Sequence, residues 1–435
     1  MHQLLKNLKL TPPYAIVGMG ITGSSLLRLL EKMDVPANQI CTFDKNDPKA
    51  QFKNPQKMIA DFQPKTMFVS PGVPLATDWI RNFEAGGGRI SSELELAFAF
   101  LTKEKTIAVT GSIGKSTTTA LIGAAIHSFS PQSFVGGNLG TPLADYALAL
   151  LNKTLPVADY VVLELSSYQL ENFRNLSVDV SVLTYLSPNH LERYKGLDDY
   201  YQTKLGLLRH TKSFVVVNKD GGDNLTVLSM KTFDDLSLFW TSRQSPLIKK
   251  YNLDQAQMIG EHNLENLAMA AQVAEIFQWP ESSLQEIKNF PGLPHRLENC
   301  GTYNDILFIN DSKATAMDPV LQATLSVISM VSENNHLRLL LGGRDKGMPW
   351  DQLGQLGQNK KIKFTFFGEF AESAKQATKL PGNTHTHLKS ALEEVFAEAK
   401  SGDLVMLSPG GTSLDEFKGF EDRGNYFKAF LKSYF

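Results

Sequence analysis

The chain of 435 residues is 42% hydrophobic and 20% charged, which excludes a disordered, collagen-like or coiled-coil protein. Its 43 basic and 45 acidic residues leave a formal charge of −2, so we expect no general attraction to nucleic acid or to anionic membranes. Two cysteines, Cys41 and Cys300, are too few for a disulfide framework and favour a cytoplasmic location. No stretch approaches the roughly 18 consecutive apolar residues that a membrane-spanning helix needs, so no membrane insertion is expected.

The first predicted strand and helix flank a glycine-rich turn within 14–23. The glycines have the spacing Gly18-x-Gly20-x-x-Gly23, and Asp44 follows 21 residues after the last of them. A dinucleotide fold places pyrophosphate at such a helix N-terminus and uses the acid to bind a ribose. Glycines in this pattern also serve packing alone, so the motif predicts only that the first domain holds a nucleotide diphosphate.

The second turn, GSIGKST at 111–117, is the strongest local signal. It follows a predicted strand and precedes a helical pattern, as do loops whose backbone N–H groups hold phosphate. Lys115 would reach the β- and γ-phosphates, and the hydroxyl of Ser116 or Thr117 would bind Mg²⁺. Val109 stands where the full Walker spacing has glycine, so this is a shortened variant of that loop. An ordinary glycine-rich turn is the alternative.

Polar residues follow two later strands of the same region. Glu164 ends the apolar run 159–165 and His190 follows the run 181–186, so both should lie at the carboxyl edge of one parallel sheet. A carboxylate there can hold Mg²⁺ beside phosphates. Taken alone, His190 is better explained as a hydrogen-bonded loop histidine, and Lys204 as a solvated lysine on a helix.

Three polar turns follow predicted strands in the last third of the chain, at 310–313, 342–346 and 408–413. Each could be a surface loop, but three in succession favour one anionic ligand held by lysines, hydroxyls and backbone N–H groups.

Strands that alternate with helical patterns predict parallel sheets and therefore an α/β fold. A run of glycines at 86–88 and the proline-containing segment 289–296 mark two breaks. We therefore predict three α/β domains, at 1–96, 97–291 and 292–435.

Together these motifs resemble those of the Mur ligases of bacterial peptidoglycan synthesis. The set extends in order along nearly the whole chain: TGSIGKST, ELSSYQL, NHLERY, Lys204, GEHNLEN, LPHR, NDSKAT and SLDEFKGFEDRGNYF. The resemblance implies a Rossmann-like UDP-binding domain, a central P-loop-type ATPase domain with a parallel sheet and a Rossmann-like C-terminal domain for the amino acid. It also implies that ATP phosphorylates a UDP-linked carboxylate and that the amine of D-glutamate displaces phosphate from the acyl phosphate.

The resemblance further assigns roles to individual residues. Those implied for ATP are Gly111, Ser112, Gly114, Lys115, Ser116, Thr117, Asn138, Asn266, Arg296 and Asp311. Those implied for the UDP substrate are Ile21, Thr22, Asp44, Lys45, Gly72, Asn138 and His190. D-glutamate would meet Thr315, Lys346, Ser413 and, through its backbone, Phe420. The implied catalytic residues are Lys115, His190, Lys204 and Lys313, and two Mg²⁺ ions would bind Ser116, Glu164, His190 and a CO₂-derived carbamate on Lys204.

The chain departs from the family pattern at Ile113, at Ala316 and in the turn SPGGTS. None of these changes removes a charge, so we expect altered affinities rather than lost activity. The alternatives are another Mur ligase or a folylpolyglutamate-type ligase, against which SLDEFKGFEDRG argues, and a dinucleotide-binding regulatory protein, which leaves the Gly-Lys-Ser loop unexplained. The expected partners are small molecules (ATP, a UDP-linked substrate and D-glutamate), and the chain is expected to act as a monomer.

Overall fold

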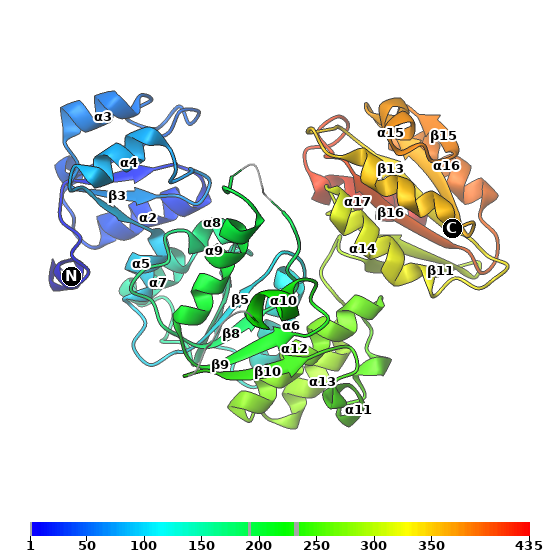
Figure 1. The fold of residues 1–435 in the computed structure, drawn as a ribbon, viewed down its shortest axis with the longest axis horizontal. Coiled ribbons are helices and arrows are strands. Elements are labelled where there is room, and N and C mark those ends of the chain that lie inside the picture. The colour runs from blue at the N-terminus through cyan, green and yellow to red at the C-terminus, as the bar shows by residue number, and fades with distance from the viewer. Residues whose placement is uncertain (1, 190–192, 230–234) are drawn as a thin grey trace. The chain divides into compact units, whose positions relative to one another are not determined.

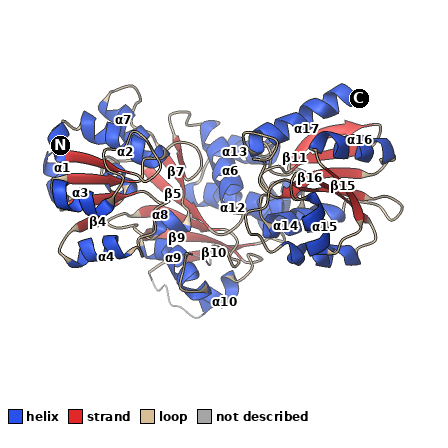
Figure 2. Ribbon diagram, turned by 90° about the horizontal axis from the view of Figure 1, so that it is seen from above, coloured by secondary structure: helices blue, strands red, loops and turns tan. Residues whose placement is uncertain are grey.

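The computed structural model describes residues 2–189, 193–229 and 235–435, and the chain divides into two compact units (Figure 1). Unit 1 comprises Met1–Leu253 and Glu265–Ile287, and unit 2 comprises Asp254–Leu264 and Lys288–Phe435. Unit 1 contains two sheets and unit 2 contains one (Figure 2). The α/β fold class is therefore confirmed, while the three-domain division stays a prediction. None of the described helices is long and apolar enough to cross a membrane.

The first sheet of unit 1 has four parallel strands in the order β2-β1-β3-β4. The strands are β1 (Tyr14–Val17), β2 (Ile40–Phe43), β3 (Thr66–Val69) and β4 (Arg89–Ser91). The helical segments are α1 (His2–Asn7), α2 (Ile21–Lys32), η1 (Ala37–Gln39), α3 (Pro55–Phe62) and α4 (Asp78–Ala85). The chain leaves β1 toward one edge and later returns to β3 on the other side. The carboxyl ends of β1 and β3 therefore open a crevice of the kind that binds ligands in α/β sheets.

The second sheet of unit 1 has six parallel strands in the order β10-β9-β8-β5-β7-β6. They are β5 (Lys105–Thr110), β6 (Phe134–Gly137), β7 (Tyr160–Glu164), β8 (Val178–Leu183), β9 (Thr211–Asn218) and β10 (Ser237–Thr241). The helical segments are α5 (Glu93–Phe98), α6 (Lys115–His127), α7 (Leu143–Leu151), α8 (Ser167–Leu170), α9 (Leu197–Arg209), α10 (Asn224–Ser229), α11 (Pro246–Lys250), η2 (Leu253–Gln255), α12 (Glu261–Phe277) and α13 (Glu281–Asn289). Because β5 lies between β7 and β8, the loops after these three strands emerge side by side.

The two sheets of unit 1 are joined through α2, α5 and α7, whose apolar residues belong to one buried cluster. Polar contacts reinforce this junction. The Ser25 hydroxyl donates to Asp145 Oδ1 at 2.6 Å, and the Ala144 N–H at the start of α7 donates to the buried Glu93 carboxylate at 2.5 Å. These contacts hold the crevice of the first sheet beside the loops of the second.

The sheet of unit 2 has the order β11-β12-β16-β13-β14-β15. Its strands are β11 (Glu298–Tyr303), β12 (Ile306–Asn310), β13 (Leu337–Gly342), β14 (Ile362–Phe367), β15 (Gly382–His385) and β16 (Leu404–Gly410). Its helical segments are α14 (Met317–Ile328), η3 (Trp350–Gln358), α15 (Ala371–Thr378), α16 (Leu388–Glu398) and α17 (Phe420–Tyr434). Two buried clusters line the sheet, one with α14, η3 and α15 and the other with α16 and α17.

One strand of unit 2 departs from the predicted parallel arrangement. β11 is antiparallel to β12, and the other strands of the sheet are parallel. Asn304 and Asp305 join the pair with φ of 48° and 63°. Two consecutive left-handed residues form the tight turn that suits an antiparallel hairpin, so no crossover helix is needed here.

Candidate functional site

The loop 111–114 connects the central strand β5 to α6 and is held against the end of β8. Gly111 has φ of +147°, and a Cβ added there would lie 2.0 Å from Thr184 Oγ1. The same hydroxyl donates to the Ile113 carbonyl at 2.6 Å, and the Ser112 N–H donates to the Tyr185 carbonyl at 2.6 Å. Only glycine fits at 111, and the loop is fixed before any ligand binds.

Lys115 is the first residue of α6, where backbone N–H groups and the helix dipole favour an anion. Its Nζ donates to the Ser112 carbonyl at 2.9 Å. The Ser112 hydroxyl donates to the Ser187 carbonyl at 2.9 Å and lies 3.0 Å from the Tyr200 hydroxyl. In the next turn of the helix, Thr118 Oγ1 donates to Asn266 Oδ1 at 3.1 Å. This arrangement presents a lysine and a helix N-terminus on one phosphate-sized loop.

Lys204 lies on α9, but its side chain is turned inward and only 2% of the residue is exposed. Its Nζ donates to the Gly111 carbonyl at 2.6 Å and lies 4.8 Å from the centre of the Tyr200 ring. The interpretation of Lys204 as a solvated helix lysine is therefore wrong. Burial, followed by the charge of Lys115, lowers the pKa of Lys204 well below its usual value, against an opposing effect of Glu164. The amine is thereby made easier to deprotonate.

Glu164 is the last residue of β7 and is 2% exposed. Its Oε1 accepts a hydrogen bond from Asn138 Nδ2 at 2.6 Å, whereas its Oε2 is buried with no hydrogen-bond partner among the described residues. An unsatisfied buried carboxylate oxygen is costly, and a bound cation would satisfy it. Within the described ranges no three His, Cys, Asp or Glu side chains are grouped to hold a metal, so Mg²⁺ would need hydroxyl or phosphate oxygens as well. His190 lies outside the described residues.

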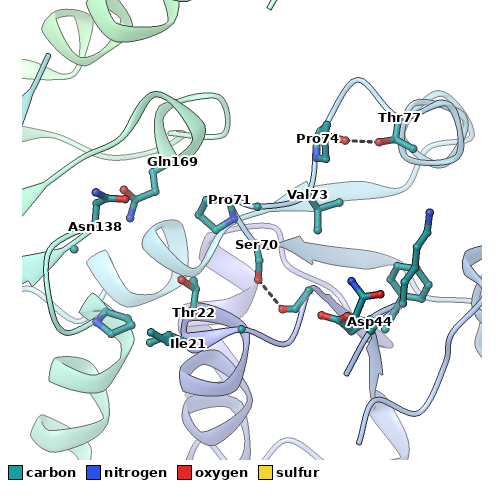
Figure 3. A pocket seen from close by; sticks show the side chains of 18 of the residues that line it. Ile21, Thr22, Asp44, Ser70, Pro71, Val73, Pro74, Thr77, Asn138 and Gln169 are labelled. Atoms are coloured by element: carbon teal, nitrogen blue, oxygen red, sulfur yellow. Dashed lines mark hydrogen bonds between the residues drawn. The ribbon is translucent and has the colours of Figure 1, made fainter. Parts of the chain in front are cut away.

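A cavity of about 570 Å³ opens at the crevice of the first sheet (Figure 3). It is lined by all the described residues that the resemblance implies for the UDP substrate, namely Ile21, Thr22, Asp44, Lys45, Gly72 and Asn138. Figure 3 shows Ile21 and Thr22 at the start of α2, with Asn138 and Gln169 on one side and Asp44 on the other; Asn138 follows β6 and Gln169 lies on α8. The volume of this cavity is typical of a pocket for a small molecule.

Several lining residues were missed from the sequence: Ser70, Thr77, Trp79 and Gln169. Gln169 belongs to the ELSSYQL motif, and Ser70 directly follows the apolar segment that forms β3, so both carried a usable signal. Thr77 and Trp79 lie at the start of α4, where no motif marks them.

The Asp44 carboxylate is bonded to the glycine-rich loop itself. Its Oδ2 accepts from the Met19 N–H at 2.8 Å, and its Oδ1 accepts from the N–H groups of Asn46 and Asp47 at 2.8 and 3.1 Å. The bond from Met19, followed by that from Asn46, lowers the pKa of Asp44. Asp44 is therefore an ionised wall of the cavity, and it holds the loop in place.

In unit 2 the three predicted polar turns lie at the ends of neighbouring strands, β12, β16 and β13. Asp311, after β12, is buried, and its carboxylate accepts from the Ser408 hydroxyl at 2.7 Å and from the Leu297 N–H at 3.2 Å. Burial raises the pKa of Asp311 to about 7. Thr315 is half-buried, Lys346 is exposed and Ser413 is buried.

The turn 293–297 is tied to the segment 311–313, as the Lys313 N–H donates to the His295 carbonyl at 3.0 Å. Arg296 is half-buried within this turn. The Lys313 Nζ lies 3.7 Å from the centre of the Phe420 ring, and the Phe420 carbonyl accepts from the Ser312 hydroxyl at 2.8 Å. Unit 2 thus brings together, at one edge of its sheet, Lys313 and the backbone of Phe420.

Comparison with known proteins agrees with this arrangement. The family described as "Mur ligase middle domain" matches residues 109–274, which include the phosphate loop, Glu164 and Lys204. Solved structures show the same fold at low identity: MurF of Thermotoga maritima in complex with ADP has a TM-score of 0.60 and 14% identity, covering 87% of this chain and 92% of that one. MurC of Thermotoga maritima has a TM-score of 0.56 and 16% identity, covering 97% of this chain and 100% of that one. The fold and the phosphate loop are those of the Mur ligases.

Curated relatives narrow the class. The UDP-N-acetylmuramoylalanine--D-glutamate ligase of Myxococcus xanthus is 33% identical to this chain. The alignment covers 84% of this chain and 83% of the Myxococcus protein. That of Alkaliphilus metalliredigens is 29% identical over 99% of each chain. The chain belongs to the UDP-N-acetylmuramoylalanine--D-glutamate ligase family of Mur ligases. The resemblance predicted from the motifs is confirmed, and the alternative of a dinucleotide-binding regulatory protein is wrong.

Proposed function

We propose that this chain joins D-glutamate to UDP-N-acetylmuramoyl-L-alanine, with ATP converted to ADP and phosphate. The observation that carries the proposal is the fixed loop 111–114 with Lys115 at the start of α6, in a chain whose relatives bear this name over most of their length. ATP would bind at this loop, and the UDP moiety would bind in the cavity of the first sheet.

The first chemical step brings together two anions, because a substrate carboxylate must attack the γ-phosphate of ATP. The step needs charge neutralisation and in-line positioning more than covalent help from the protein. Lys115 and the N-terminus of α6 supply positive potential at the loop. The carboxylate oxygen then bonds to phosphorus as the bond to ADP breaks, giving an acyl phosphate. The amine of D-glutamate attacks its carbonyl carbon, loses a proton and expels phosphate.

The residues at the loop fit Mg²⁺. The unsatisfied Oε2 of Glu164 and the hydroxyl of Ser116 would hold it, with His190 and a modified Lys204 assigned by the family resemblance. Bound Mg²⁺ would neutralise phosphate charge during transfer. Asn138 would keep Glu164 in place, since its side chain donates to Oε1 and its N–H donates to the Glu164 carbonyl at 2.8 Å.

Lys204 is proposed to carry a carbamate. Its neutral amine would form an N–C bond to CO₂ and release a proton, which turns a cation into an oxygen ligand that Mg²⁺ prefers. The lowered pKa of Lys204 supports this, because it enlarges the neutral fraction that reacts. A charged lysine beside Lys115 would instead oppose metal binding.

For unit 2 the proposal follows the family resemblance. Thr315, Lys346, Ser413 and the backbone of Phe420 would bind D-glutamate, Arg296 and Asp311 would serve ATP, and Lys313 would stabilise the phosphate being transferred. The domain at 1–96 would bind the UDP substrate, the domain at 97–291 would bind ATP, and the domain at 292–435 would bind the amino acid. The enzyme would act as a cytoplasmic monomer.

The test is to incubate the chain with ATP, Mg²⁺, UDP-N-acetylmuramoyl-L-alanine and D-glutamate, and to measure phosphate release and the mass of the product. Release should require all four, and the product should gain one glutamyl residue. L-glutamate should be used at least about tenfold less well, since the wrong enantiomer leaves a polar group unpaired. Equal or better turnover with L-alanine or a diamino acid would contradict the proposal and favour another Mur ligase.

A further inference from the structure

Arg423 is the largest fully buried side chain among the described residues, and neither the motifs nor the family resemblance assigned it a role. It lies on α17, and its guanidinium reaches the backbone of two loops. Nε donates to the Ser312 hydroxyl at 3.0 Å and Nη2 donates to the Ser312 carbonyl at 2.9 Å. Nη1 and Nη2 donate to the Gly411 carbonyl at 3.1 and 3.2 Å. One side chain therefore ties the loop after β12 to the loop after β16.

The guanidinium also lies against the loop after β13. A Cβ added at Gly343 would come within 2.9 Å of Arg423 Nη1. The neighbouring residue Gly424 packs as closely, since an added Cβ would lie 2.1 Å from His295 Nδ1. Arg423 thus lies where the three strand-end loops of unit 2 come together.

Such a cation is costly to the fold. It is near the N-terminus of α17, where the helix dipole disfavours positive charge. In the part of the chain that the structure describes, no carboxylate is hydrogen-bonded to it, and all its acceptors are neutral oxygens. Burial lowers the pKa of Arg423 to about 10, against opposing effects of the Asp415 and Glu416 charges, so it stays charged at neutral pH. A buried charge without a bonded counter-ion is weak evidence for stability, so its role has to be sought elsewhere.

We propose that Arg423 is a positioning residue for the amino-acid substrate. By holding Ser312 and Gly411 at fixed separation, it sets two residues that follow them in the same loops, Thr315 and Ser413, for a dicarboxylate ligand. Its charge adds a positive potential beneath that ligand. This inference rests on the proposed function, because the loops it organises are those assigned to D-glutamate.

Arginine suits this role better than lysine. Its planar fork carries several N–H donors in fixed directions and can bond two loops at once, whereas an ammonium is a point donor on a flexible stem. Arg423→Lys keeps the charge and approximate length but cannot keep both loops bonded in the same geometry.

The experiment compares Arg423→Lys with Arg338→Lys, each in the full chain. Arg338 is a matched control: it is also a buried arginine of unit 2, but it lies near the start of β13 and bonds to Asp403 at 2.8 Å and Glu398 at 3.0 Å. Steady-state kinetics with ATP, UDP-N-acetylmuramoyl-L-alanine and D-glutamate give KM for each substrate, and thermal melting shows that each variant is folded.

Arg423→Lys should raise the KM for D-glutamate about tenfold or more and weaken the preference for D- over L-glutamate, with the KM for ATP changed less than about threefold. Arg338→Lys should lower the melting temperature without changing the KM for D-glutamate. If Arg423→Lys also leaves that KM unchanged while the parent is active, the inference is overturned and the proposed function stands. A parent that does not use D-glutamate overturns both.

Ser312→Ala provides a second variant if Arg423→Lys does not fold. It removes an acceptor of Arg423 and, with the same hydroxyl, the hydrogen bond to the Phe420 carbonyl. It should raise the KM for D-glutamate about fivefold or more, at least the effect of losing one hydrogen bond. An unchanged KM in a folded Ser312→Ala protein overturns the inference equally.

Discussion

Two glycine-containing loops of unit 1 follow the same order of elements but differ in charge. The loop 111–114 joins β5 to α6, whose first residue is Lys115. The loop at 18–20 joins β1 to α2, whose first residue is Ile21, 74% exposed. Beside this first loop lies the ionised carboxylate of Asp44, bonded to the Met19 N–H. The local sequence motif is similar, but the electrostatic surroundings are opposite.

The difference teaches which part of a nucleotide each loop suits. The Asp44 carboxylate favours hydroxyl and amide donors beside it, as in a ribose or a base, so the diphosphate of a UDP substrate would lie away from Asp44, nearer the N-terminus of α2. At the other loop, Lys115 and the unsatisfied oxygen of Glu164 suit a phosphate with its cation. Under the proposed function, the glycine spacing marks both loops as candidate nucleotide sites, and the charges beside each loop would decide which part of the nucleotide it holds.

The largest effect is expected from removing the lysine that distinguishes the second loop. Lys115→Ala should lower kcat about 10³-fold or more while the protein stays folded, because the charge opposing that of the γ-phosphate is lost. The matched control is Lys105→Ala, an exposed lysine at the opposite end of the same strand β5. Activity of Lys115→Ala within tenfold of the parent would contradict the assignment.

Lys204→Ala should lower activity about 10²-fold or more, because it removes a proposed ligand of Mg²⁺ and loss of a group that only orients such a ligand already costs about 10- to 100-fold. If the missing group is a carbamate, acetate or formate at tens of millimolar should restore part of the rate by entering the vacated space. A plain lysine would not be replaced by an anion.

Two controls sharpen the measurement on Lys204. Acetate should leave Lys115→Ala unchanged, and Lys212→Ala, which removes an exposed lysine bonded to Asp179 at 2.9 Å, should behave as the parent does. Near-parental activity of Lys204→Ala in buffer depleted of CO₂ would refute the carbamate.

Two glycines of the first glycine-rich motif, Gly20 and Gly23, should respond differently to substitution by alanine. A Cβ at Gly23 would lie 2.0 Å from the Gly18 carbonyl, whereas one at Gly20 would meet no described atom within 4 Å. Gly23→Ala should therefore reduce the free energy of unfolding by about 1–3 kcal/mol, as overpacking does. Gly20→Ala should change it by less than about 0.5 kcal/mol. Denaturant unfolding measures both, and equal effects would contradict the distinction between the two glycines.

The sequence predicted the two loops because their signals are local. Glycine spacing, a strand before and a helix after are all readable within about a dozen residues, and the acid 21 residues later was also found. Lys204 and Arg423 show what local patterns omit. Lys204 was interpreted as a solvated helix lysine, and Arg423 was given no role. Both are buried, and segments far away in the chain, around Gly111 and Ser312, supply their acceptors.

The antiparallel strand β11 was missed for a different reason. The turn at 304–305 is Asn-Asp without glycine, and its two left-handed residues become visible only in the backbone. The unsatisfied oxygen of Glu164 likewise depends on which donors surround it in space. The sequence predicts the approximate ranges of helices and strands and the residue types in the loops between them. Which polar groups are hydrogen-bonded to one another can be read only from the packed structure.

The smallest of the effects expected on kinetics tests the role of the Asp44 carboxylate beside the first loop. Asp44→Asn keeps an acceptor for the loop N–H groups but removes the charge that we take to select a nucleoside over a phosphate. The KM for UDP-N-acetylmuramoyl-L-alanine should rise about tenfold, on the scale of one charged hydrogen bond, with the KM for ATP unchanged. Asp61→Asn, which changes an exposed acid on α3, is the matched control.

Inorganic pyrophosphate, tested as an inhibitor that competes with the UDP substrate, provides a second measurement. It should bind Asp44→Asn more tightly than the parent, because the repelling carboxylate is gone. If pyrophosphate inhibits both proteins equally, the charge of Asp44 does not affect which ligand binds, and the two loops differ only in the presence of Lys115 at the second.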